Sequence, residues 1–548
     1  MPQRRVWASG VVFATSTVLV LATVLVTAAV GAAPHAASPG SYTGPRPEVQ
    51  QAVHHDVSPP LRTLAHYNNS SGQRRDMPLR LLPVPHGASV QADPVVQSAA
   101  PGPKVGTTAG FNFNGVGDTS NTPANPCNCA PSDTNGAAGA TQFVQWVNTA
   151  FAVYNKSTGA LIMGPTAGNA LWAGFGGGCE ANNDGDIIAQ YDKANNRWVL
   201  SQFSVSTTPF LQCVAVSTTS DATGTYNRYA FTEPNFNDYP KIGIWPDGYY
   251  ASFNIFNGNT FTGARACAFD SAAMRAGGAA TQVCFQLSSS FGSLLPSDVD
   301  GTTAPPAGSP DFFLNFGTNS LNLWKFHVDF TTPGNSTFAG PTNIPVAAFT
   351  AACSGGGTCI PQPGTRNQLD SLADRLMYRL AYRNRGGTES LVVNHSVTVS
   401  GSKRSSITGI RWYELRVSRT PDPTGTVSVF QQGTFAPDSS SRWMGSIAMD
   451  KVGDIAMGYS VSSSTVFPGI RYTGRVPADA LGTMEAENTI LTGTASQTGT
   501  LHRWGDYSSM SVDPVDDCTF WYTTEYIPSS GSFNWATRIA SFKFPGCV

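Results

Sequence analysis

Charged residues are scarce in this chain of 548 residues, and the two signs nearly balance. Lys, Arg, Asp and Glu together make up 12% of the chain, and the formal net charge is -2. A protein that binds nucleic acid needs a clustered basic face, which this composition does not supply. We therefore expect no nucleic-acid partner.

Several catalytic motifs are also missing. The chain has no Gly-x-Ser-x-Gly nucleophile elbow, no His-Glu-x-x-His zinc motif and no phosphate-binding loop. Helical periodicity is almost absent from Phe111 onward, which argues against a helical fold. Any catalysis must therefore use other groups, and the Asp residues described below are the main candidates.

The chain has a single long apolar run, from about Val11 to Val30. Arg4 and Arg5 precede it and small residues follow, which is the pattern of an export signal. A run of about 20 apolar residues can also span a bilayer. Two alternatives follow for residues 1–33: a cleaved signal peptide of a secreted protein, or an uncleaved anchor at the cell surface. Membrane contact is expected only through an uncleaved segment.

Cysteines are few but even in number. Ten Cys in an exported chain are expected to pair as disulfides. The loop between Cys127 and Cys129 is too short to close comfortably, so the partners of these two stay open. The expected pairs are Cys353 with Cys359, Cys267 with Cys284, Cys179 with Cys213, and Cys518 with Cys547.

Residues 34–105 are rich in Pro, Ala, Ser and Val, which is typical of a disordered linker or pro-segment that packs little surface. From Phe111 onward, short β-type runs alternate with Gly, Asn, Asp and Pro turns. We therefore divide the chain into residues 1–33, the linker at 34–105 and one all-β domain at 106–548.

A repeated pattern predicts the architecture of that domain. Five segments begin with Asp and continue into a β-type run; they start at Asp186, Asp238, Asp311, Asp374 and Asp506. Repeats of this kind pack side by side, and the spacing leaves room for four short strands in each unit, as in a propeller blade. We predict a β-propeller with seven blades, with six as the alternative. Its innermost strands are expected to start near Phe143, Ile187, Ile242, Phe312, Leu376, Met444 and Tyr507.

The last unit has room for only three strands. A segment near residues 111–116 is expected to supply the fourth and to close the ring, because closure removes exposed strand edges.

The chain resembles exported bacterial β-propellers loosely similar to the sialidase-like, Asp-box superfamily. The resemblance rests on Pro131-Ser-Asp-Thr-Asn-Gly, the hairpin from Tyr191-Asp192 to Arg197-Trp198, Asp374-Arg-Leu-Met-Tyr-Arg and Arg503-Trp-Gly-Asp-Tyr-Ser. It departs from the Asp-box Ser-x-Asp-x-Gly-x-Thr-Trp, because Trp198 follows Asp192 by six positions in place of five and Ala194 replaces the Gly. The resemblance implies a glycan-related propeller and leaves sialidase activity in doubt.

Residues just before the innermost strands are expected to surround one mouth of the central channel. An Asp there has a structural interpretation, since it can accept hydrogen bonds that hold the turn. Alternatively, two such carboxyls act as the acid and base of glycoside hydrolysis. The catalytic candidates are Asp238, Asp374 and Asp506, and the binding candidates are Arg375, Arg442, Arg503, Trp443, Tyr507 and Tyr239.

The resemblance also implies a sialidase-type variant of the site. Arg375, Arg442 and Arg503 would clamp an acidic sugar by bidentate bonds. Tyr522 and Glu525 would then serve as nucleophile and activating carboxylate, although their alternation is equally typical of an ordinary strand.

No cofactor is expected to be required. Asp184 and Asp186, in Asn182-Asn-Asp-Gly-Asp, are the expected ligands of a structural Ca²⁺, because the turn offers closely spaced oxygen atoms.

Two function classes stay open. The first is an exported glycoside hydrolase or lyase acting on extracellular polysaccharide or glycoconjugate. The second is a non-catalytic binding or adhesion propeller. A raised pKa on one carboxyl of a pair in a concave site would favour the enzyme.

Overall fold

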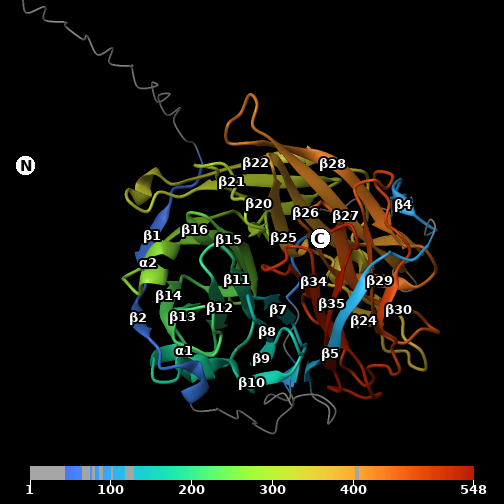
Figure 1. Cartoon of the computed structure of the whole chain (residues 1–548), viewed down its shortest axis with the longest axis horizontal. Helices are drawn as coiled ribbons and strands as arrows, with labels where there is room; N and C mark the ends of the chain where they lie inside the picture. The colour runs from blue at the N-terminus through green and yellow to red at the C-terminus, as the bar shows by residue number, and fades with distance from the viewer. Residues whose placement is uncertain are drawn as a thin grey trace, which may run out of the picture. The chain divides into compact units, whose positions relative to one another are not determined.

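Short strands rich in β-branched and aromatic residues form mainly antiparallel sheets, most of four or five strands, and one parallel pairing joins two of them into a nine-stranded sheet (Figure 1). The computed structural model describes residues 44–64, 75–76, 80–84, 91–99, 103–117, 129–401 and 406–548, all of which belong to the unit of residues 43–548. The predicted signal peptide lies outside the described residues. Within them, no helix has the length and apolar character needed to cross a bilayer.

The first three blades follow one another directly in the sequence, each starting with its innermost strand. Blade one contains β7 (Thr134–Ala138), β8 (Gln142–Val147), β9 (Ala150–Asn155) and β10 (Leu161–Ala167). Blade two contains β11 (Ile188–Asp192), β12 (Arg197–Ser204), β13 (Phe210–Ser217) and β14 (Tyr226–Glu233). Blade three contains β15 (Phe236–Trp245), β16 (Gly248–Asn257), β17 (Thr260–Phe269) and β18 (Thr281–Gln286).

The next three blades have the same order. Blade four contains β19 (Leu295–Asp300), β20 (Asp311–Gly317), β21 (Ser320–His327) and β22 (Thr337–Pro345). Blade five contains β25 (Met377–Arg385), β26 (Thr388–Ser400), β27 (Ile407–Ser418) and β28 (Thr426–Phe435). Blade six contains β29 (Ser441–Met449), β30 (Ile455–Ser462), β31 (Gly469–Arg475) and β32 (Asn488–Leu491).

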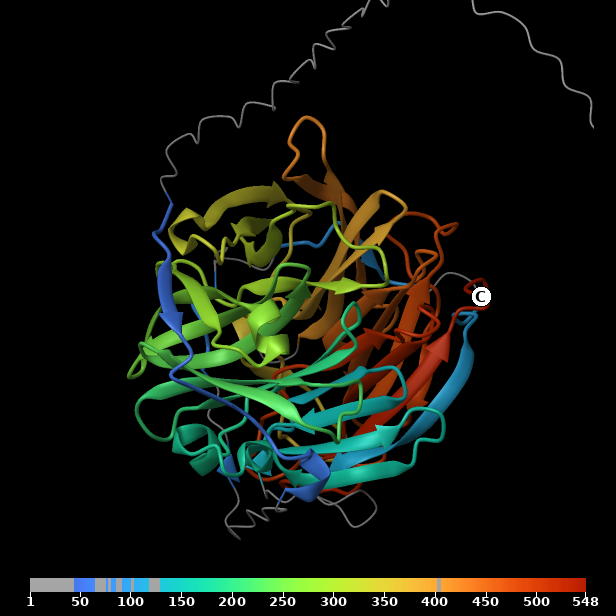
Figure 2. The same cartoon turned by 60° about the vertical axis from the view of Figure 1, so that its left-hand side comes forward.

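Blade seven is assembled from two distant parts of the sequence. It contains β33 (Ser509–Val512), β34 (Phe520–Tyr526), β35 (Ala536–Lys543) and β5 (Thr108–Gly117). The blue strand β5 lies beside the red strand β35 in Figures 1 and 2, and Ile539 pairs with Phe113. The innermost strands of neighbouring blades contact one another around a closed ring. The prediction of seven blades closed by a segment near residues 111–116 is therefore confirmed.

The remaining elements are short. The other strands are β1 (Glu48–Gln51), β2 (His54–Val57), β3 (Arg75–Asp76), β4 (Val96–Gln97), β6 (Cys129–Ala130), β23 (Thr358–Ile360) and β24 (Leu369–Asp370). The described helices are α1 (Gly177–Ala181), α2 (Ser271–Ala276), α3 (Cys353–Gly356), and the 3₁₀ turns η1 (Leu61–Thr63), η2 (Gly168–Trp172) and η3 (Pro333–Asn335).

Two of the expected innermost strands were wrong. Phe143 lies in β8 and Phe312 in β20, which are the second strands of their blades. The true innermost strands, β7 (TNGAA) and β19 (LPSDVD), contain no run of β-branched or aromatic residues. They line the channel, so they carry little of the apolar pattern that marks a strand in a sequence.

Buried ion pairs fill the channel between the innermost strands. Arg379 donates to Asp298 and Asp300 at 2.6 Å each, and Gln190 donates to Asp298 at 2.9 Å. Burial opposes ionisation of Asp300, but Arg379 and Lys193 together lower its pKa to about 2. Charges enclosed in protein need such partners, so the channel is filled by a matched network.

The described residues between 44 and 105 pack more extensively than the predicted linker. Strand β1 pairs with β18, β2 with β14 and β4 with β28, so three blades gain a fifth strand. Figure 2 shows the dark-blue N-terminal strands along the edge of the green blades. Arg228 binds Asp56 of β2, with Nε to Oδ1 at 2.8 Å. The domain boundary at residue 106 stays a prediction.

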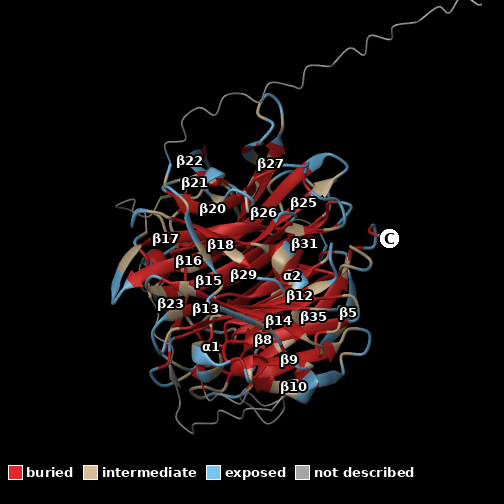
Figure 3. Cartoon of the chain, turned by 90° about the vertical axis from the view of Figure 1, so that its left-hand side faces the viewer, coloured by how far each residue is buried: buried red, intermediate tan, exposed pale blue. Residues whose placement is uncertain are grey.

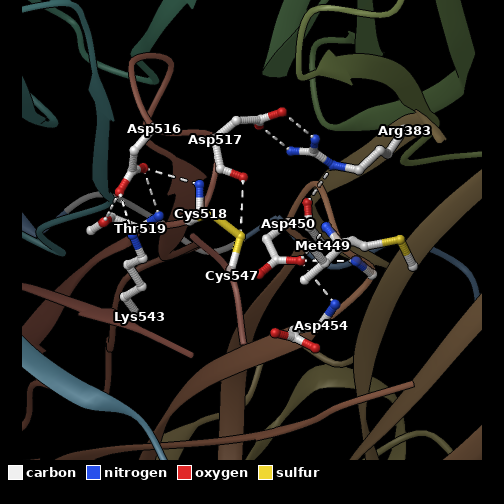
Figure 4. The surroundings of a disulfide bond; sticks show 12 residues. Arg383, Met449, Asp450, Asp454, Asp516, Asp517, Cys518, Thr519, Lys543 and Cys547 are labelled. Atoms are coloured by element: carbon white, nitrogen blue, oxygen red, sulfur yellow. Dashed lines mark hydrogen bonds and ion pairs between the residues drawn. A yellow bond between two sulfur atoms is a disulfide. The ribbon is translucent and has the colours of Figure 1, made fainter. Parts of the chain in front are cut away.

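Disulfides join neighbouring parts of single blades or loops. The four expected pairs form, and Cys127 lies outside the described residues. Beside the pair Cys518–Cys547, Arg383 donates to Asp517 at 2.7 and 2.8 Å and to the Met449 carbonyl at 2.6 Å (Figure 4). This side chain ties blade five to blades six and seven.

Burial follows the blades closely: their strands are largely buried in Figure 3, and the exposed residues gather in loops and turns. Gln145 of β8 is fully buried at the closure of the ring. Its Nε2 donates to Thr523 and Thr537, and its Oε1 accepts from Val116 of β5 at 2.8 Å. One amide group thus joins blade one to three strands of blade seven.

We expect Gln145→Ala to lower the free energy of unfolding by about 2 to 3 kcal/mol, because it leaves the buried Val116 N–H and two hydroxyls with fewer partners. Urea unfolding followed by Trp fluorescence measures the change. The control is Gln51→Ala in the exposed strand β1, which should change the value by less than about 0.5 kcal/mol. Equal effects of the two substitutions would contradict the closing role of Gln145.

Candidate functional site

Four Asp residues gather at the mouth of the channel, the end at which the innermost strands begin. Asp133, Asp186 and Asp506 precede β7, β11 and β33, and Asp238 lies in β15. The charge of Asp506 contributes to raising the pKa of the other three, so the four carboxyls share one electrostatic environment. We call these four residues together with Lys241 the carboxylate cluster.

Two of these carboxylates bind the backbone of an adjacent blade. Asp186 Oδ2 accepts from the Tyr239 N–H at 2.8 Å, and Asp133 Oδ1 accepts from the Asp506 N–H at 2.7 Å. Asp133, Asp186 and Tyr239 have φ values of 43°, 46° and 56°, which non-glycine residues seldom adopt. The hydrogen bonds hold these bends, which matches the structural interpretation of the repeated Asp. Burial is the main cause that raises the pKa of both carboxyls.

Lys241 is the central cation of the cluster, and the sequence analysis missed it. Its ammonium lies 3.4 Å from the ring centre of Tyr239 and 4.0 Å from that of Tyr507, and it donates to the Pro240 carbonyl at 2.8 Å. Burial lowers its pKa to about 7, although Asp186, Asp133 and Asp506 act in the opposite direction. Tyr239 and Tyr507 are themselves buried, so they enclose the amine and offer no open face to a ligand.

Asp238 differs from the tethered carboxylates. Within the described part of the chain, no hydrogen bond or ion pair holds its half-buried carboxyl. Burial raises its pKa to about 8, the neighbouring Asp186 adds to the rise, and Arg375 and Arg80 oppose it. Asp238 is therefore protonated at neutral pH and is not committed to holding the fold, which suits a proton donor.

Asp506 is paired with a cation and stays partly exposed. Arg503 Nη2 lies 2.6 Å from Asp506 Oδ1, and Arg503 Nη1 donates to Asp370 at 2.9 Å. Asp370 also accepts from the Trp504 N–H at 2.9 Å, and burial raises its pKa to about 7 despite Arg503. The side chain of Asp506 is 15% exposed, so this carboxylate is more exposed than Asp370, which is buried.

Asp374 and Arg375 form a closed pair. Arg375 donates to both Asp374 oxygens, at 2.6 and 3.0 Å, and its guanidinium lies 4.3 Å from the Tyr239 ring centre. Asp374 Oδ2 also accepts from the Leu82 N–H at 2.7 Å. With its side chain fully buried and three donors bound, Asp374 is poorly suited to proton transfer, although the sequence analysis proposed it as catalytic.

Arg442 and Trp443 lie apart from the carboxylate cluster. Arg442 is fully buried and binds Asp438 and Glu487, each through two hydrogen bonds. Trp443 packs on Trp504, with ring centres 5.4 Å apart, and both are fully buried. These contacts connect Arg442 to neither Arg375 nor Arg503, and the three-arginine clamp stays a prediction.

Tyr522 and Glu525 are likewise separated by the alternation of β34. The Tyr522 hydroxyl donates to Ser508 at 3.1 Å, whereas Glu525 accepts from Ser132. Burial raises the pKa of Tyr522 well above its usual value, which leaves its hydroxyl un-ionised. Both residues occupy ordinary buried strand positions.

The proposed calcium ligands have different partners. Asp184 Oδ2 accepts from the Val205 and Ser206 N–H groups at 2.6 and 2.8 Å, while Asp186 binds Tyr239. In the described ranges, no group of three or more His, Cys, Asp or Glu side chains forms a metal-binding cluster. A structural Ca²⁺ at this turn stays a prediction.

The residues that sequence reasoning missed are Asp133, Lys241 and Asp370. Asp133 lies inside the quoted Pro131-Ser-Asp segment, and Lys241 follows Tyr239 by two positions on the same strand. On a strand, residues two positions apart share a face, so the choice of Tyr239 as a site residue could have indicated Lys241 as well. No comparable pattern in the sequence indicated Asp370.

No protein-family model matches the chain, and no curated protein matches it. Solved structures similar to it include the WD40 domain of SCAP from fission yeast, with 6% identity, 74% of this chain and 82% of that chain covered, and a TM-score of 0.31. The N-terminal domain of Nup159 has 7% identity, 83% and 100% coverage and a TM-score of 0.36. An endo-arabinase from Bacteroides thetaiotaomicron has 11% identity, 65% and 92% coverage and a TM-score of 0.27. Similarities at these TM-scores carry no argument about activity.

We expect Lys241→Met to change how stability depends on pH. The pKa of Lys241 is lowered in the folded chain, so between about pH 7 and 10 the unfolded state binds more protons and wild-type stability rises with pH. The variant should lack about 3 kcal/mol of this rise. Urea unfolding of both proteins at pH 7 and pH 10 measures the difference, and parallel pH profiles would contradict the assignment.

Proposed function

We propose that the chain hydrolyses an extracellular glycan at the mouth of its channel, with Asp238 as general acid and Asp506 as the second carboxylate. The observation that carries this proposal is the contrast between two neighbouring carboxyls. Asp238 has a raised pKa and no protein hydrogen bond, whereas Asp506 is ion-paired with Arg503. Pairs of carboxyls whose environments separate their protonation states are typical of glycosidases.

The roles follow from the different surroundings of the two carboxyls. Asp238 donates its proton to the glycosidic oxygen as the bond to the anomeric carbon breaks. Asp506 supplies negative charge, either by attacking the anomeric carbon or by removing a proton from the attacking water. Arg503 holds the Asp506 carboxylate through the 2.6 Å ion pair. If Asp506 attacks, water then releases the sugar from Asp506 and gives a proton to the deprotonated Asp238. If Asp506 takes a proton from water instead, that proton returns to Asp238 through solvent.

Export agrees with this function. Four disulfides within the described residues are typical of proteins outside the cytosol, and the predicted signal at residues 1–33 would direct the chain there. The expected partner is a polysaccharide or glycoconjugate, and no cofactor enters the proposed chemistry.

A second candidate function is binding without turnover. It is supported by the backbone hydrogen bonds of Asp133 and Asp186, which use two of the four carboxylates to hold adjacent blades. The same mouth would then hold a ligand without chemistry.

We expect Asp238→Asn and Asp506→Asn each to reduce hydrolysis of a responsive glycan by at least about 100-fold, because each removes one proton-transfer or charge-stabilising group. A glycan library with reducing-sugar detection provides the assay. The matched control is Asp422→Asn, a surface carboxylate paired with Lys325, which should retain activity. If wild-type protein hydrolyses no glycan, or both mouth variants remain fully active, the catalytic proposal fails and the binding function is preferred.

The pH profile should report Asp238. A general acid with a pKa of about 8 is protonated below that value, so kcat/KM should fall as pH rises through about 8. Initial rates between pH 5 and 10 measure this alkaline limb. A rate that stays constant up to pH 10 would exclude Asp238 as the acid.

A further inference from the structure

A short extended segment of the N-terminal region lies across blades three to five. We call residues Arg80 to Val84 the strap. Its side chains alternate between solvent and protein: Leu82 is buried, whereas Leu81 is 47% exposed. This alternation is that of an extended peptide bound in a groove, with every second side chain directed into the protein.

The closed pair Asp374–Arg375 recognises the backbone of the strap. Asp374 Oδ2 accepts from the Leu82 N–H at 2.7 Å, and Arg375 Nη2 donates to the Arg80 carbonyl at 3.1 Å. The two side chains thus bind one backbone N–H and one backbone C=O of the strap, which belong to residues two positions apart. Because Asp374 and Arg375 also bind each other, the clamp is held in place before a peptide enters.

The Arg80 side chain has its own binding position. Its guanidinium lies 4.3 Å from the ring centre of Phe236 and 5.2 Å from that of Phe256, and Nη1 donates to the Gly258 carbonyl at 3.3 Å. The carboxyl of Asp238 lies close enough to interact with it electrostatically. Two aromatic faces, a carbonyl and a nearby carboxyl are complementary to a guanidinium.

Glycine makes room for the apolar side chains of the strap. A Cβ atom on Gly292 would lie 3.0 Å from Leu82 Cδ1, and one on Gly355 would lie 2.5 Å from Val84 Cγ2. Gly355 also has a left-handed φ of 95°. These two positions therefore accept apolar side chains that a larger residue would exclude.

We infer that this groove is a binding site for an extended peptide with the pattern Arg-x-Leu, and that residues 80–84 occupy it within the same chain. The backbone clamp, the guanidinium position and the Leu82 position are three elements of peptide recognition. The inference does not depend on the proposed hydrolysis, because the backbone clamp uses Asp374 and Arg375, and Asp238, which the hydrolysis uses, is only an electrostatic neighbour of Arg80 in the groove.

The test uses the full chain and a fluorescent peptide with blocked ends, Arg-Leu-Leu-Pro-Val. In wild-type protein the tethered strap competes at an effective concentration on the order of millimolar. The double variant Arg80→Ala/Leu82→Ala weakens the strap and leaves the groove intact. Fluorescence anisotropy should show that this variant binds the peptide at least about tenfold more tightly than wild-type protein does.

Two controls make the result specific. Adding Asp374→Asn to the double variant should weaken peptide binding at least about tenfold, because it removes a charged acceptor of the backbone N–H. A peptide with Ala in place of Arg and Leu should not bind. The inference is overturned if the folded double variant binds neither peptide or binds both equally.

Folding of the variants is checked by circular dichroism. If the double variant does not fold, the single variant Leu82→Ala is measured with the same peptides and judged by the same outcomes. A folded Leu82→Ala protein that binds the Arg-Leu-Leu-Pro-Val peptide no better than wild-type protein would overturn the inference.

Discussion

Pairing of β5 with β35 is the constraint on which the rest of the structure depends. Blade seven has only three consecutive strands, and without β5 the outer edge of β35 would be unpaired. Gln145 reinforces the same junction from blade one. The ring fixes the relative positions of the innermost strands, and the mouth residues precede or begin those strands. The geometry of the carboxylate cluster is therefore a consequence of closure.

Enclosure in the ring also determines the chemistry of the mouth. Carboxyls that are removed from water must be protonated, paired or hydrogen-bonded. The chain uses each solution: Asp238 has a raised pKa, Asp506 is paired with Arg503, and Asp186 binds a backbone N–H. Identical residue types at equivalent positions thus have different properties, because each blade gives its Asp a different neighbour.

The sequence predicted the features that depend on local pattern. Seven units and the closing segment follow from repeat spacing and a missing strand. The disulfides Cys353–Cys359 and Cys267–Cys284 follow from short loops, with separations of 6 and 17 residues. The innermost strands β7 and β19 were not predicted, because their sequences lack the pattern of apolar residues that marks a strand. The position of Arg442 was not predictable from the sequence. Side chains alternate between the two faces of β29, and this alternation directs the Arg442 side chain toward Asp438 and Glu487. Which Asp remains free of hydrogen bonds depends on contacts between blades, which no single segment encodes.

The order of strands in the chain has a consequence for biosynthesis. Strand β5 is made early, yet its partner β35 follows more than 400 residues later, as the separation of 424 between Asn114 and Arg538 illustrates. Contacts so distant in sequence form slowly, because a long loop must close before they stabilise the chain. Strand β5 must therefore wait, unpaired, until the last blade has been made. A chaperone that shields its edge during this interval would act on residues 108–117 before any other part of blade seven exists.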